Sequence, residues 1–291
     1  MSHVMAQSPL SIDSLPNEIL IQALSSFSTR SLLPIAAVCR RFRDLVGRLH
    51  YYRLVEATIL QDYQVVLECY HPTNKLSAPS LHCEYLGTDG LSEAGADASL
   101  ENMNRLYTRF RPFLGDEQRR PRARRPTTAV LQGKEAPLVE LPSLEISLES
   151  GEILSQLCTV ANLVKVGPRK GLFLSIAQVA DGVIRVWRDW LRDQAANSSA
   201  LKQQRAKPRL DDPSILWTDS SQDVGIKFRV VEKEDVNAPV LVGPFDEPPV
   251  SYVLEYQELI IRTNQLLLSL ETSEAQQVTH AGKAIVIASS I

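Results

Sequence analysis

Two cysteines and two histidines in the first third of the chain have the chemistry of a metal site. They are Cys69, His71, His82 and Cys83, and thiolate and imidazole are ligands that zinc prefers. His82 and Cys83 are neighbours in a segment that we predict to be a strand, so their side chains point to opposite faces and cannot readily share one tetrahedral ion. Their spacing also matches none of the common zinc patterns. We therefore predict ordinary strand residues, with no metal and no cofactor.

The sequence contains none of the common catalytic motifs. It has no Gly-x-Ser-x-Gly nucleophile turn, no glycine-rich phosphate loop followed by Lys-Ser or Lys-Thr, no dinucleotide fingerprint and no His-Glu-x-x-His. Five histidines are present, one of them close to the N-terminus, and nothing in their placement favours a triad. We therefore expect a protein that is not an enzyme.

Two tryptophans flank an Arg-Asp pair at residues 187–190. Tryptophan and arginine often anchor protein interfaces, so Trp187, Arg188 and Trp190 are candidates for binding a substrate. Buried aromatic residues also dominate core energetics, and the core is the commoner place for such residues. Both interpretations stay open at this point.

Five arginines lie within seven residues of one proline-rich segment. They are Arg119, Arg120, Arg122, Arg124 and Arg125, and clusters of this kind serve as nuclear import signals or bind nucleic acid. A solvated surface loop is the commoner structure, and no aromatic residues are interleaved to stack on bases. The chain carries a formal net charge of -3, so we expect neither nucleic acid nor a membrane as a partner. A nuclear signal is the functional candidate.

The elements that must position these residues begin with helices. Pro16 suits the first position of a helix because its φ is fixed and its missing N–H costs nothing there, and Glu18 places negative charge in the first turn. We therefore predict a helix that starts at Pro16. Its apolar residues recur at helical spacing on one side that must be buried: Ile19, Leu20, Ala23, Leu24 and Phe27.

A second amphipathic helix begins near Val38. Its apolar residues are Val38, Phe42, Leu45, Val46 and Leu49. Pro34 disfavours the α conformation at Leu33, so the segment between the two helices should form a single turn and then restart. Three short helices result. A bundle of about forty residues buries too little surface to be comfortably stable without a partner.

The order of three short motifs in this region resembles the F-box. The motifs are Leu15-Pro16, Leu32-Leu33 and Val38-Cys39-Arg40-Arg41-Phe42. Where many members of the family have a tryptophan before Arg-Leu, this chain has Tyr52, which keeps an aromatic platform. The sequence looks like the F-box proteins of filamentous fungi.

This resemblance implies a partner. F-box domains dock onto a Skp-type adaptor, through which they join cullin in an SCF-type ubiquitin ligase. The residues that match the family's pattern for adaptor binding are Leu15, Pro16, Ile19, Leu20, Leu33, Val38, Cys39 and Phe42. The alternative is a helical hairpin that packs on the rest of the chain and meets no adaptor.

Composition limits the class of protein further. A chain of 291 residues can hold two domains, and a hydrophobic content of 44% is ordinary for a globular protein. The first eleven residues lack a basic region followed by an apolar run, and no stretch approaches the roughly 20 apolar residues that cross a bilayer. The four cysteines form no secreted disulfide framework. We expect a soluble protein with free thiols in the cytoplasm, the nucleus or both.

From residue 63 onward, short apolar and β-branched runs replace helical spacing. We predict strands at residues 65–70, 81–86, 141–148, 163–166, 172–176, 182–187, 226–231, 250–256, 259–270 and 284–288. Residues 98–110 and 186–194 are compatible with helices, and residues 87–98, 116–137 and 195–213 have the composition of mobile loops. The expected fold class is α+β: a small N-terminal three-helix F-box at 11–58, followed by a larger mainly-β domain at 63–291 that forms a sandwich or distorted barrel.

These observations predict a substrate receptor, whose F-box binds the adaptor and whose β-rich domain binds a target protein. No kelch, WD or leucine-rich period is present, so the target is unknown. The alternative is a β-sandwich module that binds a carbohydrate or small molecule, with an F-box that serves its own turnover.

Overall fold

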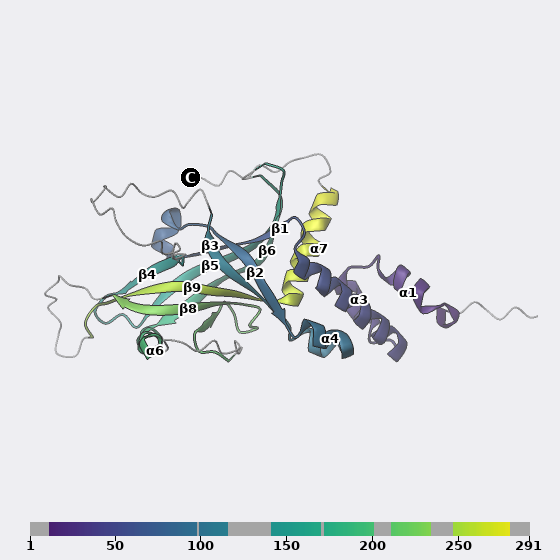
Figure 1. Cartoon of the computed structure of the whole chain (residues 1–291), viewed down its shortest axis with the longest axis horizontal. Helices are drawn as coiled ribbons and strands as arrows, with labels where there is room; N and C mark the ends of the chain where they lie inside the picture. Colours follow the sequence, from purple (N-terminus) through teal and green to yellow (C-terminus); the bar gives the residue numbers. More distant parts are fainter. Residues whose placement is uncertain are drawn as a thin grey trace, which may run out of the picture.

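The computed structural model describes residues 12–97, 99–115, 141–169, 172–200, 211–233 and 247–279. Helices fill the first part of the chain, and an antiparallel sheet with a few further helices forms the rest (Figure 1). The fold is therefore α+β, with a small helical part and a larger β-rich part, as the sequence predicts.

The helical part contains α1 (Asn17–Leu24), α2 (Thr29–Ile35) and α3 (Arg40–Ile59), preceded by the 3₁₀ turn η1 (Ile12–Ser14). Pro16 is the residue before α1, not its first residue, so the helix begins one position later than predicted. Pro34 lies inside the last turn of α2, and Leu33 is helical. The predicted break at Pro34 is wrong because a proline near the end of a helix removes only one hydrogen bond.

The core of the three helices is small. Its buried residues are Leu20, Leu24, Leu32, Ala36, Leu45, Val46 and Leu49. The second half of α3 extends beyond this core and packs on other helices: α4 (Leu91–Asp97), α5 (Leu100–Met103) and α7 (Thr263–Thr279). Leu54 and Ala57 of α3 are buried there with Leu267 of α7. The partner that so small a bundle needs is thus partly supplied by the chain itself.

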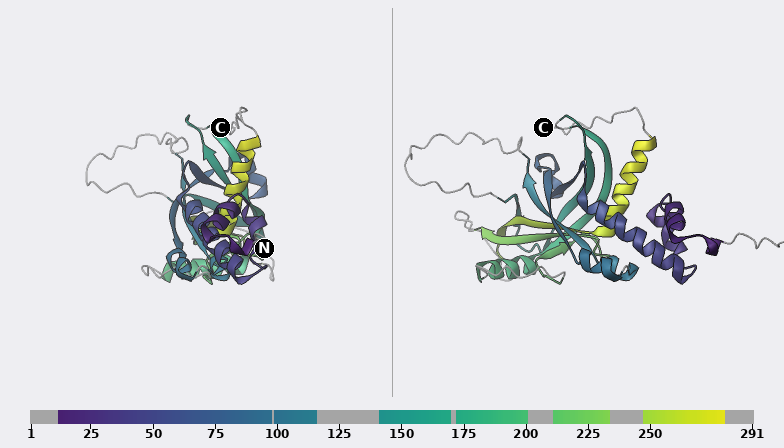
Figure 2. Two further views of the ribbon diagram at one scale, coloured as in Figure 1. Left: turned by 90° about the vertical axis from the view of Figure 1, so that its right-hand side faces the viewer. Right: turned by 45° about the vertical axis from the view of Figure 1, so that its right-hand side comes forward.

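Nine strands among the described residues form one antiparallel sheet. They are β1 (Tyr63–Tyr70), β2 (Leu81–Asp89), β3 (Tyr107–Leu114), β4 (Ser143–Leu148), β5 (Leu154–Val166), β6 (Phe173–Trp187), β7 (Ile215–Trp217), β8 (Val224–Lys233) and β9 (Val250–Arg262). The order is β6-β5-β1-β2-β3-β9-β8-β7, and β4 pairs with β9. The sheet curls so far that Gly182 of β6 lies beside Thr218, just after β7. The result is a nearly closed barrel (Figure 2).

The interior of the barrel holds the main hydrophobic core. Strands contribute alternating residues to it, as in β6, where Ile184 and Val186 are buried while their neighbours are exposed. Leu191 of α6 (Arg188–Ala200) and Leu266 of α7 join the same core. These two helices therefore complete the β-rich part, and α7 also links it to the helical part.

Two segments change type where the sequence predicts a single element. Residues 98–110 are not one helix, because α5 ends at Met103 and β3 begins at Tyr107. Residues 259–270 are not one strand, because the chain turns from β9 into α7 at Thr263. At this turn the Thr263 N–H donates to the Leu106 carbonyl, and its hydroxyl lies 3.0 Å from that of Thr108. Contacts between segments far apart in sequence decide both transitions.

Two of the predicted loops contain regular structure. The strand β2 runs to Asp89 and α4 follows, within the predicted loop 87–98. A small residue is needed in α4 because this helix packs closely on Tyr51. A Cβ on Gly95 would lie 2.5 Å from the Tyr51 ring. The predicted loop 195–213 begins inside α6. The predicted loop 116–137 and the predicted strand 284–288 lie wholly outside the described residues.

No helix in the described part of the chain is both long enough and apolar enough to span a membrane. Within the same ranges, histidine, cysteine and acidic side chains nowhere gather in a group of three that could hold a metal ion. Cys69 and Cys83 are buried thiols, and burial raises the pKa of both.

Candidate functional site

The three-helix part exposes large apolar side chains to solvent. Ile19 on α1 is 48% exposed and Val38, in the turn before α3, is 71% exposed. Leu15 and Leu33 are exposed as well. Of the five apolar residues that the sequence assigns to burial in this helix, three are therefore exposed, Ile19, Ala23 and Phe27, and only Leu20 and Leu24 are buried. Apolar surface of this kind on a small bundle is typical of a docking site for another protein.

The remaining candidate residues shape this surface. Pro16 is exposed and caps α1, while Cys39 is exposed and caps α3, where its Sγ accepts the Phe42 N–H at 3.5 Å. Phe42 is half-buried and packs on the bundle core. Leu20 is 4% exposed, so it belongs to that core and offers no surface to a partner. Its role is to support the neighbouring exposed residues.

Arg41 fixes the start of α1 against the start of α3. Its Nε donates to Asn17 Oδ1 at 2.9 Å, and its Nη2 donates to the Leu15 carbonyl. The two exposed regions around Leu15 and Val38 are therefore held at a defined separation by one guanidinium.

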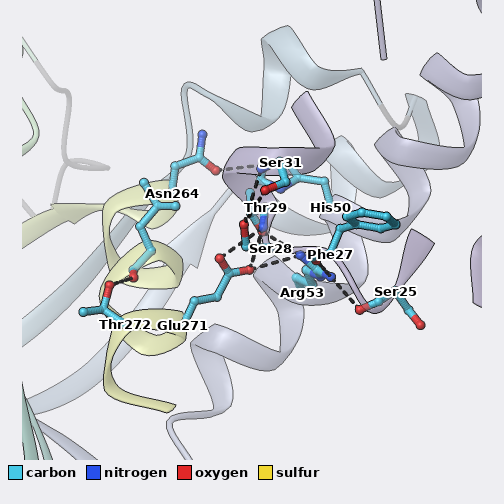
Figure 3. Close-up of polar contacts among 11 residues, drawn as sticks. Ser25, Phe27, Ser28, Thr29, Ser31, His50, Arg53, Asn264, Glu271 and Thr272 are labelled. Carbon is cyan, nitrogen blue, oxygen red and sulfur yellow. Dashed lines mark hydrogen bonds and ion pairs between the residues drawn. The ribbon is translucent and has the colours of Figure 1, made fainter. Parts of the chain in front are cut away.

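A carboxylate from α7 organises the segment between α1 and α2 (Figure 3). The Thr29 N–H donates to Glu271 at 3.1 Å, and the Thr29 hydroxyl donates to Glu271 Oε1 at 2.5 Å. These contacts place a negative charge at the first residue of α2, where the unpaired N–H groups of a helix favour an anion.

Arg53 of α3 completes this arrangement. Its Nη1 lies 3.1 Å from Glu271 Oε1, and its Nη2 donates to the Ser25 and Phe27 carbonyls at 3.0 and 2.6 Å. Both partners of the ion pair are largely buried. We call Thr29, Arg53 and Glu271 the α7 clamp, because they tie the α1–α2 segment of the bundle to α7.

A second polar contact joins α3 to α7. His50 is 4% exposed, and its Nε2 lies 3.0 Å from Asn264 Oδ1. Its Nδ1 is buried and has no hydrogen-bond partner among the described residues. Burial lowers the pKa of His50, with the Asn264 hydrogen bond opposing the effect. The ring therefore favours the neutral form at neutral pH.

The candidate residues of the tryptophan-containing segment differ in their burial. Trp187 ends β6 and is 48% exposed, whereas Trp190 packs on the main core and donates its Nε1–H to the Pro213 carbonyl at 2.7 Å. Arg188 is 5% exposed. Of these three residues only Trp187 is exposed, whereas Trp190 is partly buried and Arg188 is buried.

The guanidinium of Arg188 is occupied by intramolecular contacts. It lies 2.6 Å from Glu247 and donates to the Glu149, Glu152 and Pro248 carbonyls. Arg188 therefore anchors two backbone segments at one end of the barrel, the turn at 149–152 and the residues 247–248, and has little capacity left to bind a partner.

On the outer face of β6, Val183, Arg185 and Trp187 are exposed at every second position. They pair across to Cys158, Gln156 and Leu154 of β5. We call Val183, Arg185 and Trp187 the β6 face. The arginine-rich candidate at 119–125 lies outside the described residues.

Sequence reasoning missed the α7 clamp, His50 and Asn264. The clamp joins residues that are 242 positions apart, and a single sequence carries no signal for such a contact. Arg53 was visible only as part of the Tyr52-Arg53-Leu54 run that resembles the F-box.

A comparison with known protein families identifies the helical part of the chain. Residues 12–56 match the family described as F-box-like. The N-terminal part of this chain is therefore an F-box-like domain. F-box domains typically bind Skp-type adaptors, and proteins that carry them generally act as non-catalytic adaptors in SCF ubiquitin ligases. No curated protein and no solved structure matches the chain.

Proposed function

We propose that this protein is the substrate-recognition subunit of an SCF-type ubiquitin ligase. Its F-box-like domain binds a Skp-type adaptor, which connects it to cullin, and its β-rich domain binds a target protein. The observation that carries the proposal is the open apolar surface of a matched F-box-like domain, in which Ile19 and Val38 are exposed.

The exposure of each matched F-box residue indicates whether it contacts the adaptor directly. The exposed residues Leu15, Pro16, Ile19, Leu33, Val38 and Cys39 contact the adaptor directly, and Phe42 contacts it from a half-buried position. Leu20 acts from within the bundle core. Docking removes the exposed apolar groups from water, which favours binding in proportion to the area buried.

The target site lies on the β6 face. Trp187 supplies a large aromatic surface and Arg185 a charged group, and this pair of residue types often forms the centre of an interface. The sequence candidates for this site are Trp187, Arg188 and Trp190. The buried contacts of Arg188 and the packing of Trp190 on the main core favour supporting roles for both beside Trp187.

The chemistry belongs to other subunits in this proposal. The chain contributes proximity, because holding a target beside the ubiquitin carrier raises the effective concentration of its lysines. The Arg53–Glu271 ion pair and the Thr29–Glu271 hydrogen bonds favour a fixed placement of the F-box-like domain on α7. A fixed placement makes the effective concentration higher than a loose linker would.

Assembly with adaptor and cullin tests the proposal. The full chain should co-migrate with a Skp-type adaptor and, through it, with cullin in size-exclusion chromatography. Val38→Asp and the double variant Leu15→Ala, Pro16→Ala should lose both partners together. Ile153→Asp, at an exposed apolar residue of the β-rich part, is the matched control and should assemble normally.

Two results would contradict the proposed function. If the wild-type chain fails to bind the adaptor, the helices are only a structural hairpin. If Val38→Asp and Ile153→Asp behave alike, the adaptor binds elsewhere on the chain.

A further inference from the structure

A pocket of about 530 Å³ lies at the seam between the F-box-like domain and the β-rich part. Its lining residues come from α2 and α3 on one side and from α5, the turn before β8, β9 and α7 on the other. The F-box-like side contributes Thr29, Arg30, Leu33 and His50. Its volume is within the range of ordinary small-molecule sites, and junctions between domains are a preferred place for them.

The wall of the pocket is mainly apolar. Leu33 of α2, Leu100 of α5 and Leu268 of α7 approach it from three different elements. None of the three is fully buried, so each has apolar surface left to cover. A ligand that fills this space needs an apolar body.

Most charged groups in the lining are already paired within the chain. Asp223 lies 2.8 Å from Arg262, and Glu101 lies 3.0 Å from Arg105, just outside the lining. Arg30 is the exception among the described lining residues, because it is exposed and makes no ion pair or hydrogen bond with them. Within the described part of the chain, one positive charge at the pocket is therefore left without a partner.

The base of the seam carries an incomplete polar network. Asn264 links His50 to Asn104, whose Oδ1 accepts the Asn264 Nδ2–H at 3.0 Å. His50 also lines the pocket, and its buried Nδ1 has no hydrogen-bond partner among the described residues. Buried polar groups without a hydrogen-bond partner are rare in the interior of native proteins, and those that occur often mark a functional site.

We propose that this seam pocket binds a small apolar carboxylate, whose carboxylate group pairs with Arg30 and whose apolar body contacts Leu33, Leu100 and Leu268. The ligand touches both parts of the chain at once. It also contacts Leu33, which belongs to the proposed adaptor surface. The proposal concerns the isolated chain and does not depend on adaptor binding.

The test uses 4-phenylbutyrate and its neutral amide as probes of the full chain, with binding followed by saturation-transfer NMR. A carboxylate with twelve heavy atoms should bind saturably with a Kd on the order of 1 mM. The amide should bind at least about fivefold more weakly, because it cannot form the charged contact with Arg30.

Three variants locate the site. Arg30→Gln should weaken the acid to the level of the amide and leave the amide unchanged. Leu268→Phe should narrow the pocket and weaken binding of both probes. Asn104→Tyr blocks the same space from an exposed position and serves if Leu268→Phe folds poorly. Thermal unfolding confirms that each variant is folded.

The proposal is overturned by any of three results. These are no saturable binding to the wild type, equal affinity of the wild type for acid and amide, or unchanged affinity for both probes in folded Leu268→Phe and Asn104→Tyr.

Discussion

The carboxylate of Glu271 lies 3.1 Å from the guanidinium of Arg53, although the two residues are 218 positions apart in the sequence. The same carboxylate holds the N–H and hydroxyl of Thr29. A residue of α7 therefore acts as part of the F-box-like domain, and the domain's α1–α2 segment depends on it.

Removing this carboxylate should destabilise the whole chain. In Glu271→Ala, Arg53 keeps its carbonyl partners but loses its counter-charge, and the Thr29 N–H loses its acceptor. We expect a loss of about 1–3 kcal/mol in the free energy of unfolding, measured by chemical denaturation. Glu274→Ala, on an exposed position of the same helix, is the control and should change it by less than about 0.5 kcal/mol.

The same variant should also weaken adaptor binding, because the α1–α2 segment leads directly to Leu33. Hydrogen exchange of the Thr29 and Ser31 amides should become faster in Glu271→Ala than in Glu274→Ala. Unchanged exchange at these amides would show that the clamp does not organise this segment.

Stability should fall as the pH is lowered through the range in which His50 titrates. Burial lowers the folded-state pKa of His50 below its ordinary value of 6.5. The unfolded chain therefore binds a proton at higher pH than the folded chain does. The contribution of His50 to stability is fully present above pH 6.5 and is lost as the pH falls from there towards the lowered folded pKa.

Denaturation midpoints between pH 7.5 and pH 5 check this dependence. The charged groups that face His50 are Arg53 and Glu271, and Asn264 supplies its hydrogen bond. A His50→Gln variant should lose part of the pH dependence, and His71→Gln should retain it. Identical pH profiles for the two variants would contradict the assignment to His50.

The two neighbouring tryptophans should respond differently to truncation. Trp190→Ala removes a side chain that packs on the main core and donates to Pro213, so we expect a loss of about 2–4 kcal/mol. Trp187→Ala removes a half-exposed side chain and should cost less than about 1 kcal/mol. Equal losses would show that Trp187 belongs to the core and cannot form the β6 face.

Arg188 should tolerate no replacement that loses its planar group. Lysine keeps the charge but cannot contact Glu247 and three carbonyls together, so Arg188→Lys should lose about 1–3 kcal/mol. Arg185→Lys, at an exposed position of β6 three residues earlier, is the matched control and should be nearly neutral. A neutral Arg188→Lys would mean that the carbonyl contacts contribute little.

Local patterns predict the helical part of this chain well. The spacing of Ile19, Leu20 and Leu24 predicts α1, and the motif order predicts an F-box-like domain, which the family comparison confirms at 12–56. The same spacing does not reveal which apolar residues stay exposed. Leu20 and Ile19 are neighbours of similar hydrophobicity, and only the packing of α1 on α3 decides that one is buried and the other open.

The β-rich part is less predictable from sequence. Tyr107 and Phe110 follow helical spacing, yet pairing with β2 and β9 makes them part of a strand. At Thr263 the opposite happens, and an apolar run suited to a strand continues as a helix because it packs on α3 and β6. Gly95 looks like a loop residue, whereas its lack of a side chain allows α4 to approach Tyr51. In each case a long-range contact overrides a local preference.

The affinity of the full chain for a purified Skp-type adaptor, measured by isothermal titration calorimetry, tests the central claim most directly. We predict binding with a Kd of about 1 μM or tighter, weakened at least tenfold by Ile19→Asp or Val38→Asp and unaffected by Ile153→Asp. Absence of binding by the folded wild-type chain at adaptor concentrations of roughly 50 μM would contradict the account.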